Sequence, residues 1–185
     1  MAGGNANCLE LNDFDKDGFN EILVGTDDFA IRFYKNENNL FQIDETTEII
    51  NLTSINENKF IYALENGTIG VYNNRERTWR KKVKKCLTFQ EKGYICSTFK
   101  YDINNDGINE IICGWNTGKL QVREESNGTI IFEQDLKKEM SKLLLGDLNN
   151  QEKKQLICCH SNGESNIVCN FASIWINVWR GRENV

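Results

Sequence analysis

The chain has 185 residues, of which 39% are hydrophobic and 26% are charged, and its formal net charge is −5. This length suits one domain with a sizeable core, and the apolar content excludes a disordered tail. The acidic balance argues against a general nucleic-acid binder, and no apolar run reaches the roughly 20 residues of a membrane helix. The first residues, Met1 to Asn5, are neither basic nor strongly apolar, so they show no secretory signal pattern.

In chain order, the sequence consists of short β-type runs separated by turn residues. Four hairpins are predicted, because Gly, Asn or Asp between two β-rich runs supplies the tight turn; they comprise 21–25 with 30–34, 60–64 with 68–72, 110–115 with 119–123, and 155–159 with 166–169. An inner strand is predicted before each hairpin, at 8–11, 48–53, 94–99 and 143–145. An outer strand is predicted after the first three, at 40–43, 78–83 and 129–132. The helix-like stretch 136–144 is interpreted as a turn between repeats that leads into the next strand.

The hairpins recur at a nearly fixed period. Their turns centre on Asp28, Gly67, Gly118 and Gly163, at spacings of 39, 51 and 45 residues. A period of this length with about four short strands per repeat is typical of β-propeller blades. The sequence therefore predicts an all-β fold, a partial β-propeller of nearly four blades with about four antiparallel strands each. We expect the blades, an incomplete ring, in residues 1–164, and in 165–185 either a last strand pair or a divergent end.

Two loops carry the most specific chemical signal. We count positions from Asp13 in the first loop and from Asp102 in the second. Oxygen-bearing side chains then occupy positions 1, 3 and 5, and a Gly follows at position 6. This spacing can wrap a hard cation such as calcium, with a backbone carbonyl at position 7 and a carboxylate at position 9 completing the shell. The candidate ligands are Asp13, Asp15, Asp17, Phe19 and Glu21 in the first loop, and Asp102, Asn104, Asp106, Ile108 and Glu110 in the second.

A metal site is one of two interpretations of these loops. An EF-hand would need Glu at position 12, where this chain has Val24 and Cys113, and a helix would follow it. The loops are instead typical of the DxDxDG turns between strands of calcium-binding propellers. A third copy, Asp147 to Glu152, lacks both the Gly and the position-5 acid. This loss favours the other interpretation, in which the acidic residues cap the turn through hydrogen bonds to the backbone.

A basic stretch also has two interpretations. Residues 75–85 carry seven positive charges in eleven positions. Such a stretch can bind an acidic partner, an anionic membrane surface or RNA. It can equally be an exposed outer strand that its lysines protect from pairing with other chains.

The remaining reactive residues predict no enzyme. The seven cysteines lie mostly in apolar runs and form no CxxC pair, so we expect reduced core cysteines. The one histidine, His160, is expected to be a polar surface residue in a turn at a strand end. No nucleophile motif accompanies it, so most acid–base schemes lack a partner, and no cofactor besides calcium is expected.

Several blocks of sequence, in order, resemble one known family. They are 13–18 with 21–32, 62–72 with 79–80, 106–110 with 114–115, and 155–159. Together, from about Asn12 to Gly163, they resemble the C-terminal part of the N-terminal β-propeller in the Bardet–Biedl syndrome 2 family of BBSome subunits. Beyond Glu164 the resemblance ends.

The resemblance implies a subunit of the BBSome, the coat-like complex that moves membrane proteins into and out of cilia. It implies a docking and assembly module rather than a catalyst, located in the cytoplasm, the cilium, the ciliary membrane and the basal body region. The implied partners are other BBSome subunits, an Arf-like GTPase, ciliary membrane cargo and an anionic membrane surface, with no nucleic acid. The alternative is a calcium-binding, adhesion-type propeller, which would predict a secretory signal and oxidised cysteines.

Overall fold

A computed structural model describes residues 3–82, 93–104, 106–148, 154–169 and 175–179. These residues form sixteen strands in four antiparallel sheets of four strands each. The first sheet contains β1 (Ala6–Asn12), β2 (Glu21–Thr26), β3 (Ala30–Lys35) and β4 (Asn38–Asp44). The second contains β5 (Ile49–Ser54), β6 (Lys59–Leu64), β7 (Thr68–Asn73) and β8 (Glu76–Lys82). The third contains β9 (Ile95–Tyr101), β10 (Glu110–Trp115), β11 (Lys119–Glu124) and β12 (Ile130–Asp135), and the fourth β13 (Met140–Gly146), β14 (Gln155–His160), β15 (Ser165–Cys169) and β16 (Trp175–Trp179).

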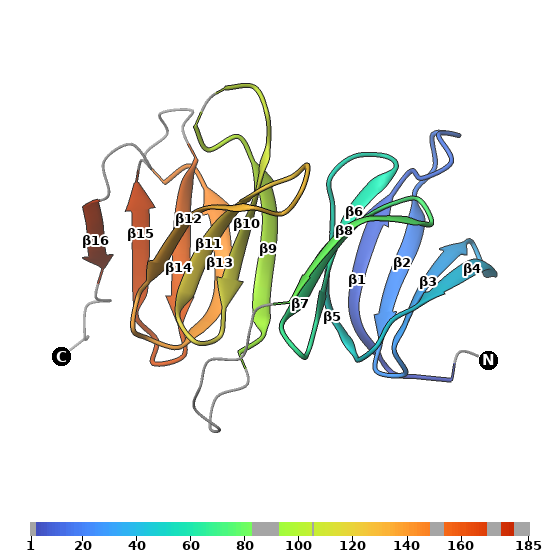
Figure 1. The fold of residues 1–185 in the computed structure, drawn as a ribbon, viewed down its shortest axis with the longest axis horizontal. Helices are drawn as coiled ribbons and strands as arrows, with labels where there is room; N and C mark the ends of the chain where they lie inside the picture. Colours follow the sequence, from blue (N-terminus) through green and yellow to red (C-terminus); the bar gives the residue numbers. More distant parts are fainter. Residues whose placement is uncertain (1–2, 83–92, 105, 149–153, 170–174, 180–185) are drawn as a thin grey trace.

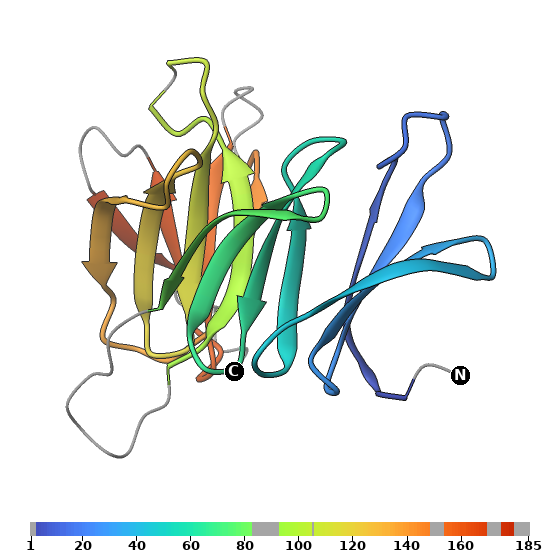
Figure 2. The same ribbon diagram turned by 45° about the vertical axis from the view of Figure 1, so that its right-hand side comes forward.

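The four sheets stand side by side in chain order, like consecutive blades (Figures 1 and 2). The first strands of neighbouring sheets contact one another, β1 with β5, β5 with β9, and β9 with β13. The later strands of each sheet fan outward from this inner row (Figure 2). The all-β, four-stranded repeat predicted from the sequence is therefore confirmed, and the described part of the chain holds no helix that could cross a membrane.

Apolar side chains from facing sheets form the core. Three clusters fill the spaces between the first and second, second and third, and third and fourth sheets. Strands β6 and β10 lie between two neighbouring sheets, so they bury both faces, and Tyr62, Ile61, Ile111 and Ile112 are fully buried. Outer strands such as β4 alternate between exposed and partly buried residues, because one face meets solvent.

The hairpin turns follow the predicted chemistry in three sheets and differ in one. Gly67, Gly118 and Gly163 have positive φ angles of 78°, 89° and 82°. In the first sheet, Phe29 takes this place with a φ of 71°, an uncommon conformation for a bulky residue. The Ala30 N–H donates to the Thr26 hydroxyl oxygen (3.3 Å) and closes this turn.

The fourth sheet differs from the sequence-based prediction in its first strand. The predicted strand 143–145 is part of the longer β13, and much of the helix-like stretch 136–144 is therefore extended. Met140 and Leu143 are buried against the third sheet, and this tertiary contact overrides the local helical pattern. After it, β15 and β16 pair with each other and extend the same sheet beyond residue 164.

Candidate functional site

The first acidic loop, between β1 and β2, is closed by its own side chains. Asp13 accepts hydrogen bonds from the N–H groups of Asp17 (3.1 Å) and Gly18 (2.9 Å). Asp15 accepts from the N–H of Asp17 (3.3 Å), and Asp17 accepts from the N–H of Phe19 (3.0 Å). Gly18 has a φ of 89°, which explains why glycine occupies position 6. The alternating acids thus cap successive backbone donors of one tight turn.

The second loop, between β9 and β10, repeats this pattern at every corresponding position. Asp102 accepts from the N–H groups of Asp106 (3.1 Å) and Gly107 (2.8 Å). Asn104 accepts from the N–H of Asp106 (2.9 Å), and Asp106 accepts from the N–H of Ile108 (2.8 Å). The geometry is therefore a property of the motif rather than of one blade.

The residue at position 9 begins the second strand of its sheet and turns back to cap the loop. Its side-chain oxygen accepts from the backbone N–H at position 2, in three sheets: Glu21 from Phe14 (2.7 Å), Glu110 from Ile103 (2.9 Å) and Gln155 from Leu148 (2.7 Å). All three side chains are buried. Because the neutral Gln155 makes the same contact as the two glutamates, an uncharged oxygen acceptor is sufficient for it in the fourth sheet.

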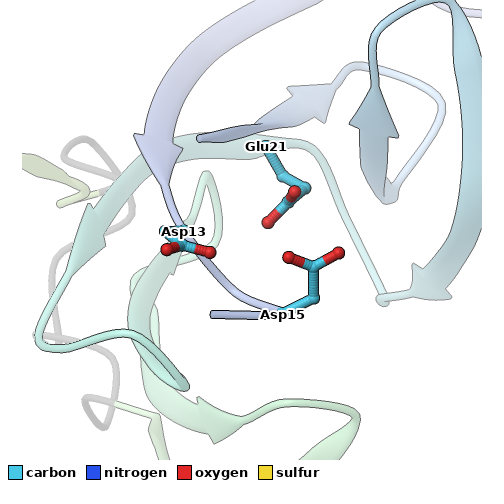
Figure 3. Close-up of side chains that lie close together, drawn as sticks. All are labelled: Asp13, Asp15 and Glu21. Atoms are coloured by element: carbon cyan, nitrogen blue, oxygen red, sulfur yellow. The ribbon is translucent and has the colours of Figure 1, made fainter. Parts of the chain in front are cut away.

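In the first loop, the ammonium group of Lys35 lies among the acidic side chains. Its Nζ is 2.5 Å from Asp17 and 3.2 Å from Glu21, and it also forms an ion pair with Asp15. The hydrogen bond from Lys35 lowers the pKa of Asp17, and the bond to Asp15 raises the pKa of Lys35. Carboxylate oxygens of Asp13, Asp15 and Glu21 come within 4.8 Å of one another, and Figure 3 shows them facing a common centre.

The second loop has no lysine at the corresponding place. In the first sheet Ile22 pairs with Tyr34, and Glu21 and Lys35 are the next residues along the two strands. In the third sheet the residue opposite Glu110 is Glu124. Glu124 accepts a hydrogen bond from Asn127 (2.6 Å). The Asn104 amide group instead donates to Asp106 (2.9 Å) and Glu110 (3.2 Å), so an N–H donor joins the acids of this loop as well.

These contacts bear on the predicted calcium ligands. The structure brings together the side chains of Asp13, Asp15, Asp17 and Glu21 in one loop, and of Asn104, Asp106 and Glu110 in the other. A cation between the acids of the first loop would compete with Lys35, because the ammonium group already forms ion pairs with Asp15, Asp17 and Glu21. Calcium binding by either loop, including through the carbonyls of Phe19 and Ile108, stays a prediction.

The basic stretch lies on β8, the outer strand of the second sheet. Arg77 and Arg80 form ion pairs with Glu45 (2.9 and 3.4 Å), whose side chain is fully buried. Trp79 is also buried, and its indole N–H donates to the carbonyl of Glu125 in the third sheet (2.7 Å). Lys81 and Lys82 are exposed, while residues 83–85 lie outside the described part. Arg77 and Arg80 therefore pair with the connection between the first and second sheets, and the exposed positive charges among the described residues of the stretch are Arg75, Arg77, Lys81 and Lys82.

Sequence reasoning missed Lys35 and Glu45, because their partners lie on other elements. Lys35 could have been found from the turn at Asp28. Glu21 and Lys35 are equally far from this turn along the chain, so they should lie opposite each other on the two strands of the hairpin. No comparable local signal identifies Glu45, because the arginines that form ion pairs with it lie on a strand of the next sheet.

Solved structures with a similar fold are β-propellers or related proteins. BBS1N, in its crystal structure in complex with ARL6DN, matches with a TM-score of 0.74 and 12% identity, covering 96% of this chain and 57% of that chain. The C-terminal WD40 domain of Sif2 matches with a TM-score of 0.66 and 15% identity, covering 90% of this chain and 46% of that chain. At these identities the matches show the fold alone, and they confirm a β-propeller architecture.

Sequence comparison identifies the family. The family model described as "Ciliary BBSome complex subunit 2, middle region" matches residues 8–123. The human protein "BBSome complex member BBS2" is 38% identical over 164 residues, which cover 89% of this chain and 22% of that protein. The chain thus spans about a fifth of the length of this relative. With a model match over most of its residues and this degree of identity, the chain belongs to the family of ciliary BBSome complex subunit 2.

Proposed function

We propose that this chain is a non-enzymatic docking and assembly module of a BBSome, and that it acts in the trafficking of ciliary membrane proteins and in ciliogenesis. The observation that carries the proposal is the family match over residues 8–123, a segment that consists of propeller sheets and their loops. Propeller sheets present loops and strand edges to partners, and such surfaces suit a scaffold.

The chemistry of the described residues supports a scaffold rather than a catalyst. His160 is buried, with its Nδ1 3.2 Å from the carbonyl oxygen of Glu139, so its ring is part of the packing. The acidic residues of the two loops bond to the backbone of their own turns, or to Lys35 and the Asn104 amide. Groups used in this way hold loops in shape, as a docking surface requires.

The partners follow from the family. The relatives are named as BBSome complex members, so we propose other BBSome subunits as the first partners. BBS1N was crystallised in complex with ARL6DN, and on that analogy an Arf-like GTPase is a second candidate. Ciliary membrane cargo is a third, and the places of action would be the cytoplasm, the cilium with its membrane, and the basal body region.

A pull-down from ciliated cells tests this proposal. The tagged chain is expressed in parallel with tagged human BBS2 and with the tag alone, and the recovered proteins are identified by mass spectrometry. We expect other BBSome subunits with the chain and with human BBS2 but not with the tag. Recovery of these subunits with human BBS2 and not with the folded chain would overturn the proposal.

An anionic membrane surface is a separate proposed partner, and the exposed Lys81 and Lys82 are the described residues suited to it. Flotation with vesicles that contain phosphatidylserine tests it, with the Lys81→Glu, Lys82→Glu double variant beside the wild type. We expect the wild type to float with anionic vesicles and the variant to float less. Equal flotation of the two proteins would remove the lysines from the membrane hypothesis.

A further inference from the structure

A small pocket lies between the third and fourth sheets, where the inner strands β9 and β13 begin (Figure 1). Its volume is about 310 Å³, at the small end of the roughly 300–1,000 Å³ that ligand pockets span. Such a volume suits one side chain or a very small molecule. The residues that line it are Tyr94, Asn116, Glu139, Met140, Ser141 and Ser161.

Hydrogen bonds to the backbone fix the walls of this pocket. The N–H of Met140, on the fourth sheet, donates to the carbonyl of Asn116, in the β10–β11 turn of the third (3.0 Å). The Asn116 N–H donates to the Tyr94 carbonyl (3.0 Å), and the Asn116 side-chain oxygen accepts from the Tyr94 N–H (2.7 Å). The Ser161 N–H donates in the same way to the Glu139 carbonyl (3.0 Å). Because these bonds join both sheets, the pocket is preformed, which lowers the entropic cost of filling it.

The charge of the pocket comes from Glu139. Among the described residues that line the pocket, Glu139 alone is charged. Its carboxylate Oε2 accepts from the hydroxyl of Ser161 (3.1 Å), and this bond orients the side chain. The neighbouring Lys138 forms its ion pair with Glu164. The pocket therefore carries negative charge and favours a cation over an anion.

The side chains of Tyr94 and Met140 give the pocket apolar walls. Met140 is buried, and Tyr94 is 40% exposed. An aliphatic stem can pack against such walls, and an aromatic ring attracts a cation near its face. Calcium would instead need roughly six to eight oxygen ligands. One carboxylate beside apolar walls therefore fits an organic cation with an aliphatic stem better than a metal ion.

The oxygens of the pocket favour an ammonium group over a guanidinium group. A guanidinium binds a carboxylate best through two parallel hydrogen bonds, one to each oxygen. In Glu139, Oε2 already accepts from Ser161, so Oε1 is the oxygen with its full accepting capacity. An ammonium donates three hydrogen bonds in separate directions, which suits one carboxylate oxygen together with the hydroxyls of Ser141 and Ser161.

We propose that this pocket binds the side chain of a lysine that a protein partner presents, with its ammonium on Glu139 and its stem against Tyr94 and Met140. This inference deepens the proposed docking role and rests on it for the source of the lysine. The chemistry of the pocket can be measured without any BBSome subunit. A failed titration of the pocket and a failed pull-down of subunits are therefore separate results.

Titration of the isotope-labelled chain with Nα-acetyl-lysine methylamide, followed through backbone amide resonances, tests the pocket. We expect saturable shifts at Met140, Ser141 and Ser161 with a Kd of about 1 mM, since one side chain supplies few contacts. The same probe acetylated at Nε, which has no charge, and the corresponding arginine probe should each bind at least about tenfold more weakly. Absence of saturable shifts at these residues, or equal binding of either comparison probe, would overturn the proposal.

Glu139→Gln tests the role of the charge with little change in shape. The variant keeps an oxygen that can accept from Ser161, and we expect it to raise the Kd of the lysine probe about tenfold or more. Glu65→Gln is the matched control, because Glu65 is an exposed carboxylate in the turn between β6 and β7 that does not line the pocket. The amide spectrum verifies that both variants are folded. An unchanged Kd in Glu139→Gln, or an equal increase in Glu65→Gln, would contradict the assignment of the ammonium to Glu139.

Discussion

Lys35 and Arg32 form ion pairs with acidic side chains of the first sheet in two different ways. Lys35 inserts a flexible ammonium group among the carboxylates of the β1–β2 loop. Arg32 is 8% exposed at its side chain and holds Asp28 in a planar, two-pronged contact, with distances of 2.9 and 2.5 Å. The ammonium is a point charge that a metal ion could replace, whereas the guanidinium fixes geometry as well as charge.

Lys35→Met is expected to make the first loop depend on calcium. The change leaves Asp15, Asp17 and the buried Glu21 without their counter-ion, and mutual repulsion then destabilises the loop. In EDTA we expect the melting temperature to fall by about 2–4 °C. Millimolar calcium, which prefers oxygen ligands, should restore it in the variant more than it raises that of the wild type. Differential scanning fluorimetry with both additions measures this effect.

Lys119→Met is the matched control for this experiment. Lys119 also forms an ion pair, 3.6 Å from Glu133, but it lies on β11 away from both acidic loops. Its loss should leave the calcium response at the wild-type level. If calcium raised the wild-type melting temperature as much as that of Lys35→Met, Lys35 would not occupy the place of the cation.

Asp28→Asn is expected to reduce the loss of stability in acid. Hydrogen bonds from Arg32 and Thr26 lower the pKa of Asp28 from its ordinary 3.8 to about 2. Because the folded-state pKa lies below the unfolded one, the stabilisation is complete above about pH 4 and disappears as the pH falls toward 2. Urea unfolding at pH 7, 4, 3 and 2 should therefore show a smaller decline for the variant than for the wild type.

Asp17 is another carboxylate whose pKa is lowered, through its hydrogen bond from Lys35. The informative quantity is therefore the difference between variant and wild type at each pH. Asp44→Asn, an exposed position on β4, serves as the comparison. A decline in Asp28→Asn as steep as in the wild type would show that the contact with Arg32 does not couple stability to pH.

At the level of elements, each acidic loop is a folded unit that joins two strands. Its N–H groups are used by its own side chains, and the residue at position 9 ties it to the second strand of the sheet. A rigid loop places an exposed apolar side chain at position 7, Phe19 in the first and Ile108 in the second. Where a propeller uses its loops to bind partners, this rigidity lowers the entropic cost of binding.

Replacing Glu110 separates the role of its oxygen from the role of its charge. Glu110→Gln keeps an oxygen that can accept from Ile103, as Gln155 does from Leu148, so we expect only a small loss of stability. Glu110→Ala leaves that N–H and the Asn104 amide without this acceptor, and should cost about 1–3 kcal/mol of unfolding free energy. Equilibrium urea denaturation compares the two. A loss in Glu110→Gln as large as in Glu110→Ala would mean that the charge is required.

Some features of these elements could be predicted from the sequence, and others could not. Hairpins and their register were accessible, because turn residues such as Gly67 and Gly118 require positive φ and fix the pairing around them. The start of β13 was not, since its extended conformation depends on burial against the third sheet. His160 was expected at the surface and is buried, because the carbonyl of Glu139, from the segment before β13, lies beside its ring. The ligand spacing of the loops could be predicted from the sequence. The ion pairs between Lys35 and the acids of the first loop could not, because Lys35 belongs to another strand.

At the scale of the whole molecule, the sheets form a row in which each contacts only its neighbours. Inner sheets are packed on both faces, whereas the first and fourth have one packed face each within the described residues. In such a row, stability is close to a sum of contributions from each unit and each interface, and end units open more easily than inner ones. Two buried cysteines report on different positions in this row.

Cys113 and Cys158 are expected to become reactive at different urea concentrations. Cys113 lies in the cluster between the second and third sheets, and Cys158 in the cluster between the third and fourth. Burial raises the pKa of both thiols to about 12, so neither supplies thiolate in the folded state and modification requires opening. Pulsed labelling with iodoacetamide, analysed by peptide mass spectrometry, should show Cys158 reacting at a lower urea concentration than Cys113.

Labelling without urea provides the control, because both thiols are fully buried and neither should react. Coincident labelling of both thiols across the urea series would mean that the four sheets unfold as one cooperative unit, which would contradict the row of separable sheets.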